Sequence, residues 1–366
     1  MTLIVTVIVI ALAFEFINGF HDTANSIATV VSTKVLTPRQ AIVLAAATNL
    51  FGALLGTAVA KTITGGLVDS GVVAITSDII ACALLGAIAW NLITWWFGLP
   101  SSSSHALIGG LCGAALAASH NRWNVIIWAQ PSSVHWYLGK GLLWKVIVPM
   151  FLSPLLGFVC GFILMAFLYL TLWNKRPSKV NAFFGVAQMF SAGAMGIMHG
   201  TNDAQKTMGI IALSLLSATK AGTFDHLPGW LAFLHSAPPM PGKDLEIATW
   251  IKVTCALVMA SGTSVGGWRI IKTLGHKMVK LHPINGFAAE TSSATVIGLA
   301  SVLGIPVSTT HNISAAIMGV GCAKRFNAIK WSVVERMVWA WILTLPVTGL
   351  LGYALVRLSQ ACGWTL

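Results

Sequence analysis

Long apolar runs, separated by short polar segments, dominate the chain. The runs span residues 2–17, 41–60, 79–97, 104–118, 144–173, 183–198, 208–219, 247–260, 291–305, 311–323 and 337–358. A helix needs roughly 20 apolar residues to cross a bilayer. We therefore expect roughly 10–12 membrane-embedded helical segments, some of them crossing only half of the bilayer. The run 144–173 exceeds one span, and it is either one long tilted helix or a helix with an interfacial part.

The composition excludes a soluble protein. Of the 366 residues, 56% are hydrophobic and only 9% are charged, whereas soluble domains carry about 25% charged residues. The chain is therefore predicted to be an all-α polytopic membrane protein in the lipid bilayer. The first run lacks a basic segment and a clear cleavage site, so we expect a retained helix rather than a signal peptide. The six cysteines show no CxxC spacing and are expected to be small buried hydrophobic residues.

The net charge is +12, and the basic residues gather in three short segments, 175–179, 269–280 and 324–330. Positive loops beside membrane spans mark the cytoplasmic side, so we place these segments there. Contact with lipid headgroups is a further role. Nucleic acid is not an expected partner, because no basic run comes with an aromatic platform.

Two motifs occur twice, in the same order. The first half contains 21-HDTANS-26 and 98-GLPSSSSHALIGG-110, and the second contains 202-NDAQKT-207 and 304-GIPVSTTHNISAA-316. A Pro- and Gly-rich segment, 221–244, makes the second half longer and is interpreted as an inserted loop. The chain thus consists of two homologous units, 1–175 and 180–366, which form one transport domain. Such repeats are typical of secondary transporters with a midplane site between them, and we favour the inverted orientation.

Asp22 and Asp203 occupy equivalent positions in these units. Each could cap a helix N-terminus, but an acid within a membrane segment is by default a functional candidate. Small polar residues follow each acid, so we expect both helices to break there and to line a polar cavity. Lys206 is expected to pair with Asp203 and contact an anion, the alternative being a side chain that reaches toward the membrane interface.

The segments 101–105 and 308–311 both follow a Gly-x-Pro sequence and both carry helix-start signals. They are either ordinary helix caps or a cradle for an anion, built from free N–H groups and hydroxyls. His105 and His311 either carry protons or, as we favour, hold each hairpin through a ring hydrogen bond. Glu15 and His21 receive no role.

Together these elements predict a central pocket with carboxylates, hydroxyls, helix N-termini and one ammonium group. Carboxylates repel an anion in a low dielectric unless a cation or proton lies between them. The pattern therefore favours cotransport of an oxyanion with a cation or proton. Phosphate can donate a hydrogen bond to a carboxylate at neutral pH and sulfate cannot, so phosphate is preferred and a sulfate symporter is the alternative.

Two other classes of function are disfavoured. Intramembrane aspartyl proteases carry a Gly-x-Gly-Asp motif, and neither 19-GFHD-22 nor 200-GTND-203 matches it. A hydrolase also has no use for paired Ser-rich hairpins, so we do not expect an enzyme. The acids in the pocket disfavour a passive anion channel.

Five segments, 18-NGFHDTANS-26, 90-WNLITWWFGLPSSSSHALIG-109, 199-HGTNDAQK-206, 266-GGWRIIKTLGHKM-278 and 304-GIPVSTTH-311, closely resemble the PiT family of inorganic phosphate transporters. The resemblance covers nearly the whole chain. It implies a phosphate symporter of the inner (plasma) membrane, with two inverted repeats that each contribute a re-entrant helical hairpin. It also implies no cofactor beyond the coupling ion, H+ or Na+, and it suggests a homodimer.

Carried over by position, the resemblance implies a set of phosphate ligands: Asp22, Thr23, Asn25, Ser26, Ser103, Ser104, Asp203, Gln205, Lys206, Thr309 and Thr310. The implied groups for a metal cation or proton are Asp22, Asn25, Asp203 and Glu290. Relatives often carry a long hydrophilic central loop. Only 174–180 and 221–244 stand in its place here, so regulation through a loop is not expected.

One departure concerns the coupling ion. Sodium-coupled members of the family carry a Glu in a pattern like ETVG, whereas this chain has Asn49 in 48-TNLFG-52. We interpret Glu290 as the second-half counterpart of that position. Asn49 resembles the bacterial proton-coupled members and Glu290 the sodium-coupled ones. We favour protons, with a neutral metal–phosphate complex as a further substrate form.

Overall fold

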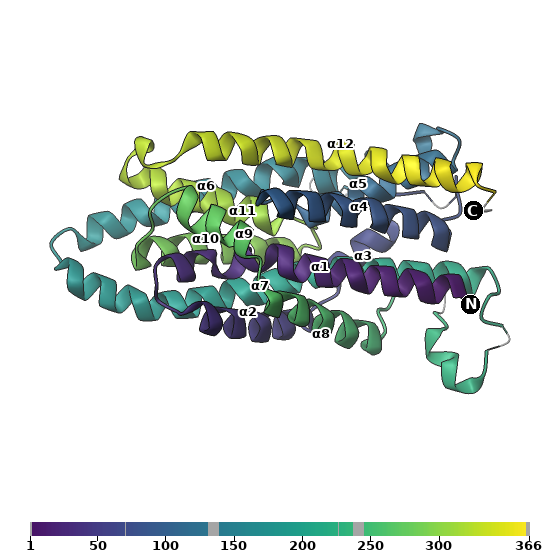
Figure 1. Cartoon of the computed structure of the whole chain (residues 1–366), viewed down its shortest axis with the longest axis horizontal. Helices are drawn as coiled ribbons and strands as arrows, with labels where there is room; N and C mark the ends of the chain where they lie inside the picture. The colour runs from purple at the N-terminus through teal and green to yellow at the C-terminus, as the bar shows by residue number, and fades with distance from the viewer. Residues whose placement is uncertain (1, 70, 131–138, 226, 237–244, 364–366) are drawn as a thin grey trace.

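The computed structural model describes residues 2–69, 71–130, 139–225, 227–236 and 245–363, and in these ranges the regular elements are helices (Figure 1). The α-helices are α1 (Thr2–Ser32), α2 (Pro38–Ala53), α3 (Ala58–Gly65), α4 (Ser77–Phe97), α5 (Ser103–Ala118), α6 (Val148–Leu172), α7 (Pro177–Lys220), α8 (Thr249–Val265), α9 (Trp268–Lys272), α10 (Pro283–Val302), α11 (Thr309–Lys324) and α12 (Trp331–Ala361). Short π-helical turns precede α6 and follow α9.

Several of these helices can cross a membrane. In the described part, five are long and apolar enough: α1, α4, α7, α12 and the continuous segment Leu143–Leu172. The helices α2 and α3, bent by 67° at their junction, qualify as a sixth span when taken together. The apolar run 144–173 is therefore one long helix. These findings confirm an all-helical, multi-pass membrane protein.

The predicted breaks in the helices at the acidic motifs are wrong. The helix α1 continues through residues 18–26, and α7 continues through residues 199–207. Asp22 and Asp203 consequently lie inside helices and cap neither. Polar residues are tolerated there because neighbouring helices surround them, and the two acids are only 2% and 1% exposed. The runs 183–198 and 208–219, predicted as separate segments, are parts of the single helix α7.

The order of elements repeats in the two halves. A long helix opens each half, and the helices α6 and α12 that close the halves each contain an internal proline, Pro154 and Pro346. In Figure 1, α1 runs away from the end of the molecule where α12 finishes, whereas α7 runs toward that end. The equivalent helices α1 and α7 therefore point in opposite directions.

Two turns of the same design connect α4 to α5 and α10 to α11. Gly98 and Gly304 both adopt φ +64°, a left-handed conformation that glycine reaches without strain. Ser102 and Ser308 then cap the following helices, each accepting a hydrogen bond at 3.2 Å from the backbone N–H three residues on. The predicted helix starts in both Ser- and Thr-rich motifs are confirmed.

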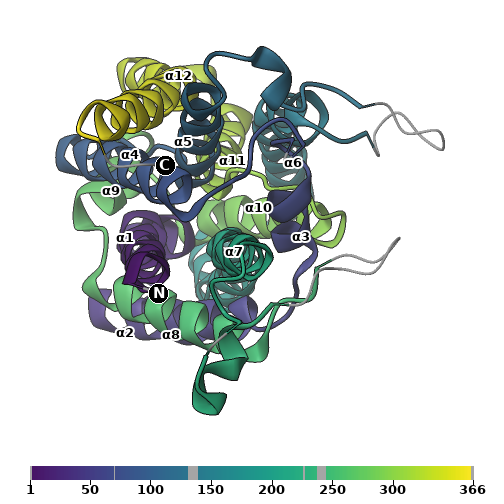
Figure 2. The ribbon, with the colours of Figure 1, turned by 90° about the vertical axis from the view of Figure 1, so that its right-hand side faces the viewer.

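The two halves interlock, because the main helices of one half pack on those of the other. The helix α1 packs on α8, α2 on α7, α5 on α12 and α6 on α11. Glycines permit the last two contacts: a Cβ added at Gly113 would lie 1.8 Å from the backbone oxygen of Gly349, and one at Gly319 would lie 2.0 Å from that of Phe158. Figure 2, which looks along the bundle, shows α10 and α11 near its middle.

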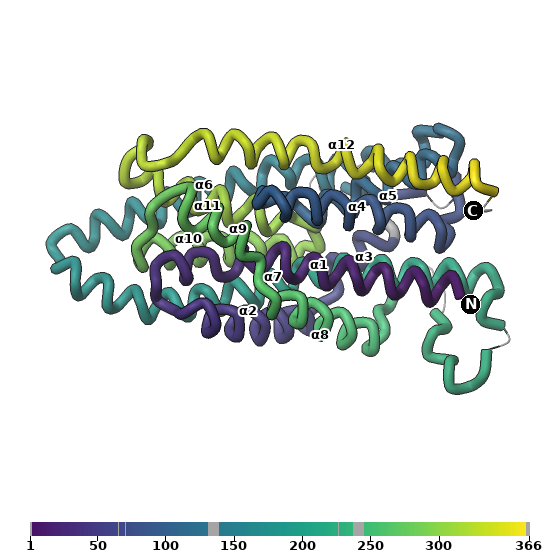
Figure 3. Tube along the Cα trace, in the orientation of Figure 1, coloured from purple at the N-terminus to yellow at the C-terminus, as the bar shows by residue number. Residues whose placement is uncertain are grey.

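The basic segments gather at one end of the molecule. Segment 175–179 covers the end of the α6–α7 turn and the first residues of α7. This segment and the start of α12 lie opposite the start of α1 (Figures 1 and 3). Segment 324–330 meets the end of segment 269–280, where the backbone N–H of Lys330 donates to the carbonyl oxygen of Met278 at 3.0 Å. The described residues therefore have a distinctly basic end.

The cysteines are only partly as predicted. All six are free, but only Cys112 and Cys255 are buried, while Cys362 is exposed and the other three are half-buried.

Candidate functional site

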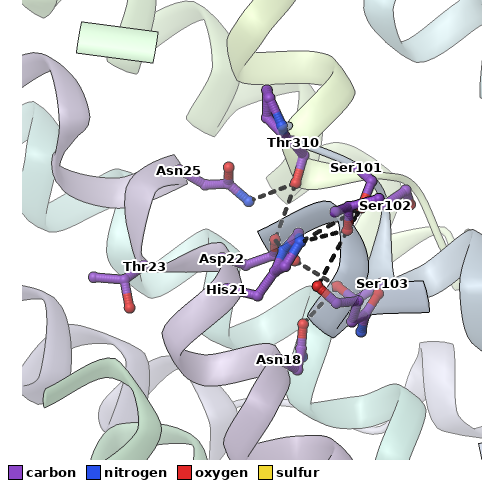
Figure 4. Close-up of polar contacts among 12 residues, drawn as sticks. Asn18, His21, Asp22, Thr23, Asn25, Ser101, Ser102, Ser103 and Thr310 are labelled. Carbon is purple, nitrogen blue, oxygen red and sulfur yellow. Dashed lines mark hydrogen bonds and ion pairs between the residues drawn. The ribbon is translucent and has the colours of Figure 1, made fainter. Parts of the chain in front are cut away.

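A buried polar cluster lies where the middle of α1 meets the middle of α7 and the starts of α5 and α11 (Figure 4). The repeated motifs supply most of its side chains. The Gly-x-Pro turns place the hydroxyls of Ser103 and Ser104, and of Thr309 and Thr310, in the first turns of α5 and α11. The cluster thus combines residues from both halves of the chain.

Asp22 is surrounded by neutral or weakly basic donors. Ser103 Oγ lies 2.5 Å from Asp22 Oδ2 and 2.6 Å from Asn18 Oδ1, and its single proton serves one of the two. Thr310 Oγ1 donates to Asp22 Oδ1 at 3.2 Å, and His21 Nδ1 lies 2.7 Å from the same oxygen. The other ring nitrogen of His21 lies 3.2 Å from Thr94 Oγ1, so the imidazole links Asp22 to α4.

Asp203 has a cationic partner. Lys206, one helical turn later in α7, pairs with Asp203 Oδ1, which confirms the predicted ion pair. Thr309 Oγ1 donates to Asp203 Oδ2 at 2.9 Å, and His199 Nε2 lies 3.0 Å from that oxygen. The Lys206 ammonium also donates to Ser104 Oγ and, at 3.1 Å, to the backbone oxygen of Val307. The lysine therefore joins α7 to the starts of both α5 and α11.

Asn25 completes the cluster. Its amide nitrogen donates to Thr309 Oγ1 at 3.1 Å and to Thr310 Oγ1 at 2.9 Å. Its buried amide oxygen has no hydrogen-bond partner among the described residues. Buried polar atoms are usually paired, so this oxygen is an acceptor ready for a cation or for a protonated ligand.

One group of side chains has the chemistry of a cation site. Asp22, His199 and Asp203 each offer a ligand atom, and these atoms lie within 4.8 Å of one another. Carboxylate oxygens suit hard cations, and a neutral imidazole suits transition metals. The residues thus fit a cation, with Asn25 as a neighbouring oxygen donor.

The charges of the cluster restrict what it can bind. With neutral imidazoles, the two carboxylates and one ammonium group sum to −1. An oxyanion that enters this buried space meets a net repulsion unless a cation or proton accompanies it. The hydroxyls, the Lys206 ammonium and the N-termini of α5 and α11 are then available to contact its oxygens.

Four predicted site residues lie apart from these contacts. Thr23 Oγ1 donates to Gly19 O at 2.6 Å, and Figure 4 shows Thr23 directed away from Asp22. Gln205 turns toward α3, where its side-chain oxygen accepts from the backbone N–H of Val59 at 2.7 Å. Ser26 is buried, and its hydroxyl has no partner among the described residues. The fourth residue, Glu290, is treated next.

Glu290 belongs to a separate polar group. Its carboxylate accepts hydrogen bonds from Thr29 and Ser191, and from Gln188 Nε2 at 3.2 Å. It lies in α10, whose counterpart by element order is α4. Asn49 lies in α2, whose counterpart is α8. The interpretation of Glu290 as the counterpart of Asn49 is therefore wrong.

Sequence reasoning missed Asn18 and His199. Each stands four residues before an aspartate, one helical turn away, and each contacts the cluster. The signal was the spacing itself: aligning Asp22 with Asp203 also aligns these two residues. Glu15, left without a role, accepts a hydrogen bond from Thr207 and so links α1 to α7.

His105 and His311 meet between the two hairpins. Their ring centroids are 4.9 Å apart in an edge-to-face contact, and His311 stacks on Trp341 at 4.3 Å. One ring nitrogen of each lacks a partner among the described residues. The expected ring hydrogen bonds that would hold the hairpins are absent from these contacts, and the Ser102 and Ser308 hydroxyls cap the helices instead.

Comparisons with known proteins show the family and the fold of the chain. The model of the "Phosphate transporter family" matches residues 18–352. A Bacillus subtilis protein named "Probable low-affinity inorganic phosphate transporter" is 44% identical over 350 residues, covering 96% of this chain and 95% of the relative. A Rhizobium meliloti protein of the same name is 43% identical, with coverage of 95% and 94%. A solved structure, "The sodium-dependent phosphate transporter", shares the fold, with a TM-score of 0.77 at 23% identity over 99% of this chain and 100% of that one.

Proposed function

The chain belongs to the phosphate transporter family, a family of transporters rather than enzymes, and from that premise we propose that it is a secondary symporter of inorganic phosphate and protons. Phosphate binds at the buried cluster, in contact with the Lys206 ammonium and the hydroxyls of the two hairpins. Protons neutralise the acids as phosphate enters. No cofactor is needed beyond the coupling ion.

The observation that carries this proposal is the cluster's charge in its buried setting. Asp22 and Asp203 come from opposite halves and both contact hairpin hydroxyls, but the one ammonium group of the cluster pairs with Asp203 alone. A site with an excess acid favours an anion that brings a neutralising proton or cation with it.

Asn49 supports protons over sodium. Its amide donates to Thr263 Oγ1 at 3.1 Å, and its oxygen lies 3.0 Å from His199 Nδ1. The position therefore supplies a neutral amide that is already hydrogen-bonded, where the resemblance implies a carboxylate in sodium-coupled members. A neutral metal–phosphate complex is a further substrate form, since Asp22, His199 and Asp203 together can ligate a divalent cation.

The topology extends the proposal. The opposed directions of α1 and α7 support two inverted repeats, and the pairs α4–α5 and α10–α11 are proposed as re-entrant hairpins that meet near the midplane. The basic end then faces the cytoplasm. The protein is proposed to lie in the plasma membrane, and a homodimer stays an expectation from the resemblance.

Uptake of labelled phosphate into proteoliposomes tests the proposal. An inward proton gradient should drive accumulation that a protonophore abolishes, and a sodium gradient at constant pH should not. Accumulation driven by a sodium gradient alone would identify sodium, rather than the proton, as the coupling ion. Uptake that merely equilibrates under every gradient would reject symport altogether.

Sulfate is the second candidate, because it has the same tetrahedral shape. The contacts to Asp22 favour phosphate, which carries a proton near neutral pH that it can donate to a carboxylate. Excess sulfate should therefore fail to compete with labelled phosphate. Equal competition by both anions would make the protein a general oxyanion symporter.

A further inference from the structure

The basic end of the molecule contains a cavity that the transport site does not use. It lies between the start of α10 and the end of α11, and its volume is about 220 Å³, several times the roughly 30 Å³ that one water occupies in the liquid. Lys280, His282, Lys324 and Arg325 line it, together with Asn285 and Asn327. We propose that this cavity binds a phosphate group, carried by an anionic lipid headgroup or by a soluble phosphate compound.

The charge of the lining supports an anionic ligand. Among the described residues that line the cavity, none is acidic. Lys280, Lys324 and Arg325 are exposed, so their heads are hydrated and can exchange water for phosphate oxygens. Positive charge alone is usual at a cytoplasmic face. A concave space with convergent lysine and arginine side chains is a more specific feature, because basic pockets of this kind bind lipid headgroups.

The surroundings of the cavity favour the lipid headgroup. Phe326 lies in sequence between the lining residues Arg325 and Asn327, and Trp331 follows shortly after; their rings stack at 4.6 Å, and they are 63% and 41% exposed. Exposed aromatic residues at the ends of membrane helices sit at the headgroup level. The cavity is therefore at the depth where lipid phosphates lie.

The position of the cavity connects it to the hairpin α10–α11. Its lining comes from the segment that leads into α10 and the first turn of that helix, and from the last turn of α11 and the residues that follow it. The opposite end of α11 carries Thr309 and Thr310, which contact the buried cluster. A phosphate group in the cavity would bridge the free ends of the two hairpin arms, and we expect its occupancy to change the rate of uptake.

Two charge-matched variants test the site. Lys280→Gln/Lys324→Gln/Arg325→Gln, the cavity variant, removes three cations from the cavity. Lys175→Gln/Arg176→Gln/Lys179→Gln, the turn variant, removes three from the α6–α7 turn and the start of α7, at the same end of the molecule. Purified proteins in phosphatidylcholine nanodiscs are titrated with phosphatidylglycerol, counted by native mass spectrometry, and separately with labelled pyrophosphate. The dissociation constant of the cavity variant should be roughly 100-fold higher than that of the wild type for whichever of the two probes the cavity binds. The turn variant should bind both probes as the wild type does.

The outcomes separate the two sources of phosphate. Selective loss of phosphatidylglycerol identifies the headgroup, and selective loss of pyrophosphate identifies a soluble compound. Equal binding by all three proteins, or equal loss in both variants, overturns the proposal. Lys324→Gln alone is the second variant if the triple one misfolds, with a smaller loss expected. Phosphate uptake into liposomes of phosphatidylcholine alone, measured for the wild type and both variants, tests the transport function separately from binding at the cavity.

Discussion

Asp22 and Asp203 stand at equivalent positions of the two halves, yet they have different partners. The framework around them is nearly symmetric: Ser103 contacts Asp22, and its counterpart Thr309 contacts Asp203. The difference comes three residues after each acid, where the first half has Asn25 and the second has Lys206. Asp203 is thus neutralised within the protein, whereas Asp22 receives its hydrogen bonds from hydroxyls and an imidazole.

The different partners of Asp22 and Asp203 indicate different roles for the two carboxylates. A carboxylate with a permanent ammonium partner contributes mainly to the architecture and charge of the site. A carboxylate with hydroxyl and imidazole partners gains most from a proton or cation supplied from outside. We therefore propose that Asp22 couples phosphate to its co-ion and that Asp203 positions Lys206.

The largest expected effect separates these roles. Asp22→Asn should abolish concentrative uptake while leaving the protein folded, because the asparagine oxygen can still accept from the buried hydroxyl donors Ser103 and Thr310. Asp203→Asn should also abolish uptake, but it leaves the buried Lys206 ammonium without its carboxylate, at a cost of about 3–5 kcal/mol in unfolding free energy. Uptake in proteoliposomes and thermal unfolding in detergent measure both effects.

The double variant Asp203→Asn/Lys206→Asn is the matched control for this comparison. Removing both charges should recover most of the lost stability, since no unpaired charge stays buried, while uptake stays absent. Equal stability of the two single variants would contradict the division of roles. Full transport by either single variant would remove that acid from the site.

The next largest effect is expected from Lys206, the residue at which the second half differs from Asn25 of the first. Lys206→Asn gives the second half the residue found at the first, and it deletes a charged donor to phosphate. Hydrogen bonds to charged groups contribute about 1.5–3 kcal/mol, so the KM for phosphate should rise roughly 10- to 100-fold. Initial rates of labelled uptake give the KM. An unchanged KM would place phosphate away from Lys206.

A smaller effect is expected from the hairpin hydroxyls. Thr310→Val deletes the bond to Asp22, and Thr309→Val deletes the bond to Asp203, with little change in side-chain shape. Each carboxylate keeps its other partners, so the loss should be near the lower end for hydrogen bonds to charged groups, about 1.5 kcal/mol, or roughly a tenfold change in KM. On the proposal that Asp22 couples the co-ion, only Thr310→Val should also shift the pH dependence of uptake. The same pH profile in both variants would contradict the asymmetry.

The sequence predicted much of the site because the motifs are local and occur twice. The two acids, the hydroxyls of the hairpins and the helix starts at Ser103 and Thr309 followed from motif and spacing. The continuity of α1 and α7 did not, because a polar stretch breaks a helix only when its neighbours fail to satisfy it. Here other helices surround the polar stretch of each helix, and the local sequence does not predict these tertiary contacts.

Orientation around a helix was the second limit. Each residue turns 100° from the last, so neighbours in one motif face different partners. Asn25 faces the hairpins, whereas Thr23 faces α8, where its hydroxyl lies 3.4 Å from the Thr263 backbone oxygen. His199 was missed for the converse reason, since one helical turn separates it from the acid that it contacts.

A residue predicted as a ligand but turned away gives a further test. Gln205 accepts from the N–H of Val59 at the start of α3, and Thr62 of α3 donates to Gly304 O at 2.7 Å in the second hairpin turn. Gln205→Leu should therefore lower the maximal rate of uptake a few fold, through a misplaced α3, and leave the KM unchanged. A raised KM with an unchanged rate would restore Gln205 as a ligand.

The smallest effect is expected at Thr23, one residue after Asp22. Its hydroxyl bonds within α1 to Gly19 O at 2.6 Å, an oxygen that already belongs to the helix ladder, and it faces α8 rather than the cluster. Thr23→Val should leave the KM and the pH profile within about twofold of the wild type, because an intrahelical bond of this kind adds little. Asn25→Val, two residues further along α1, is the matched comparison and should raise the KM at least fivefold, since it deletes donors to Thr309 and Thr310 and an open acceptor oxygen. Labelled uptake at two pH values measures both variants. Equal effects at the two positions would mean that the motif as a whole, and not its inward face, binds phosphate.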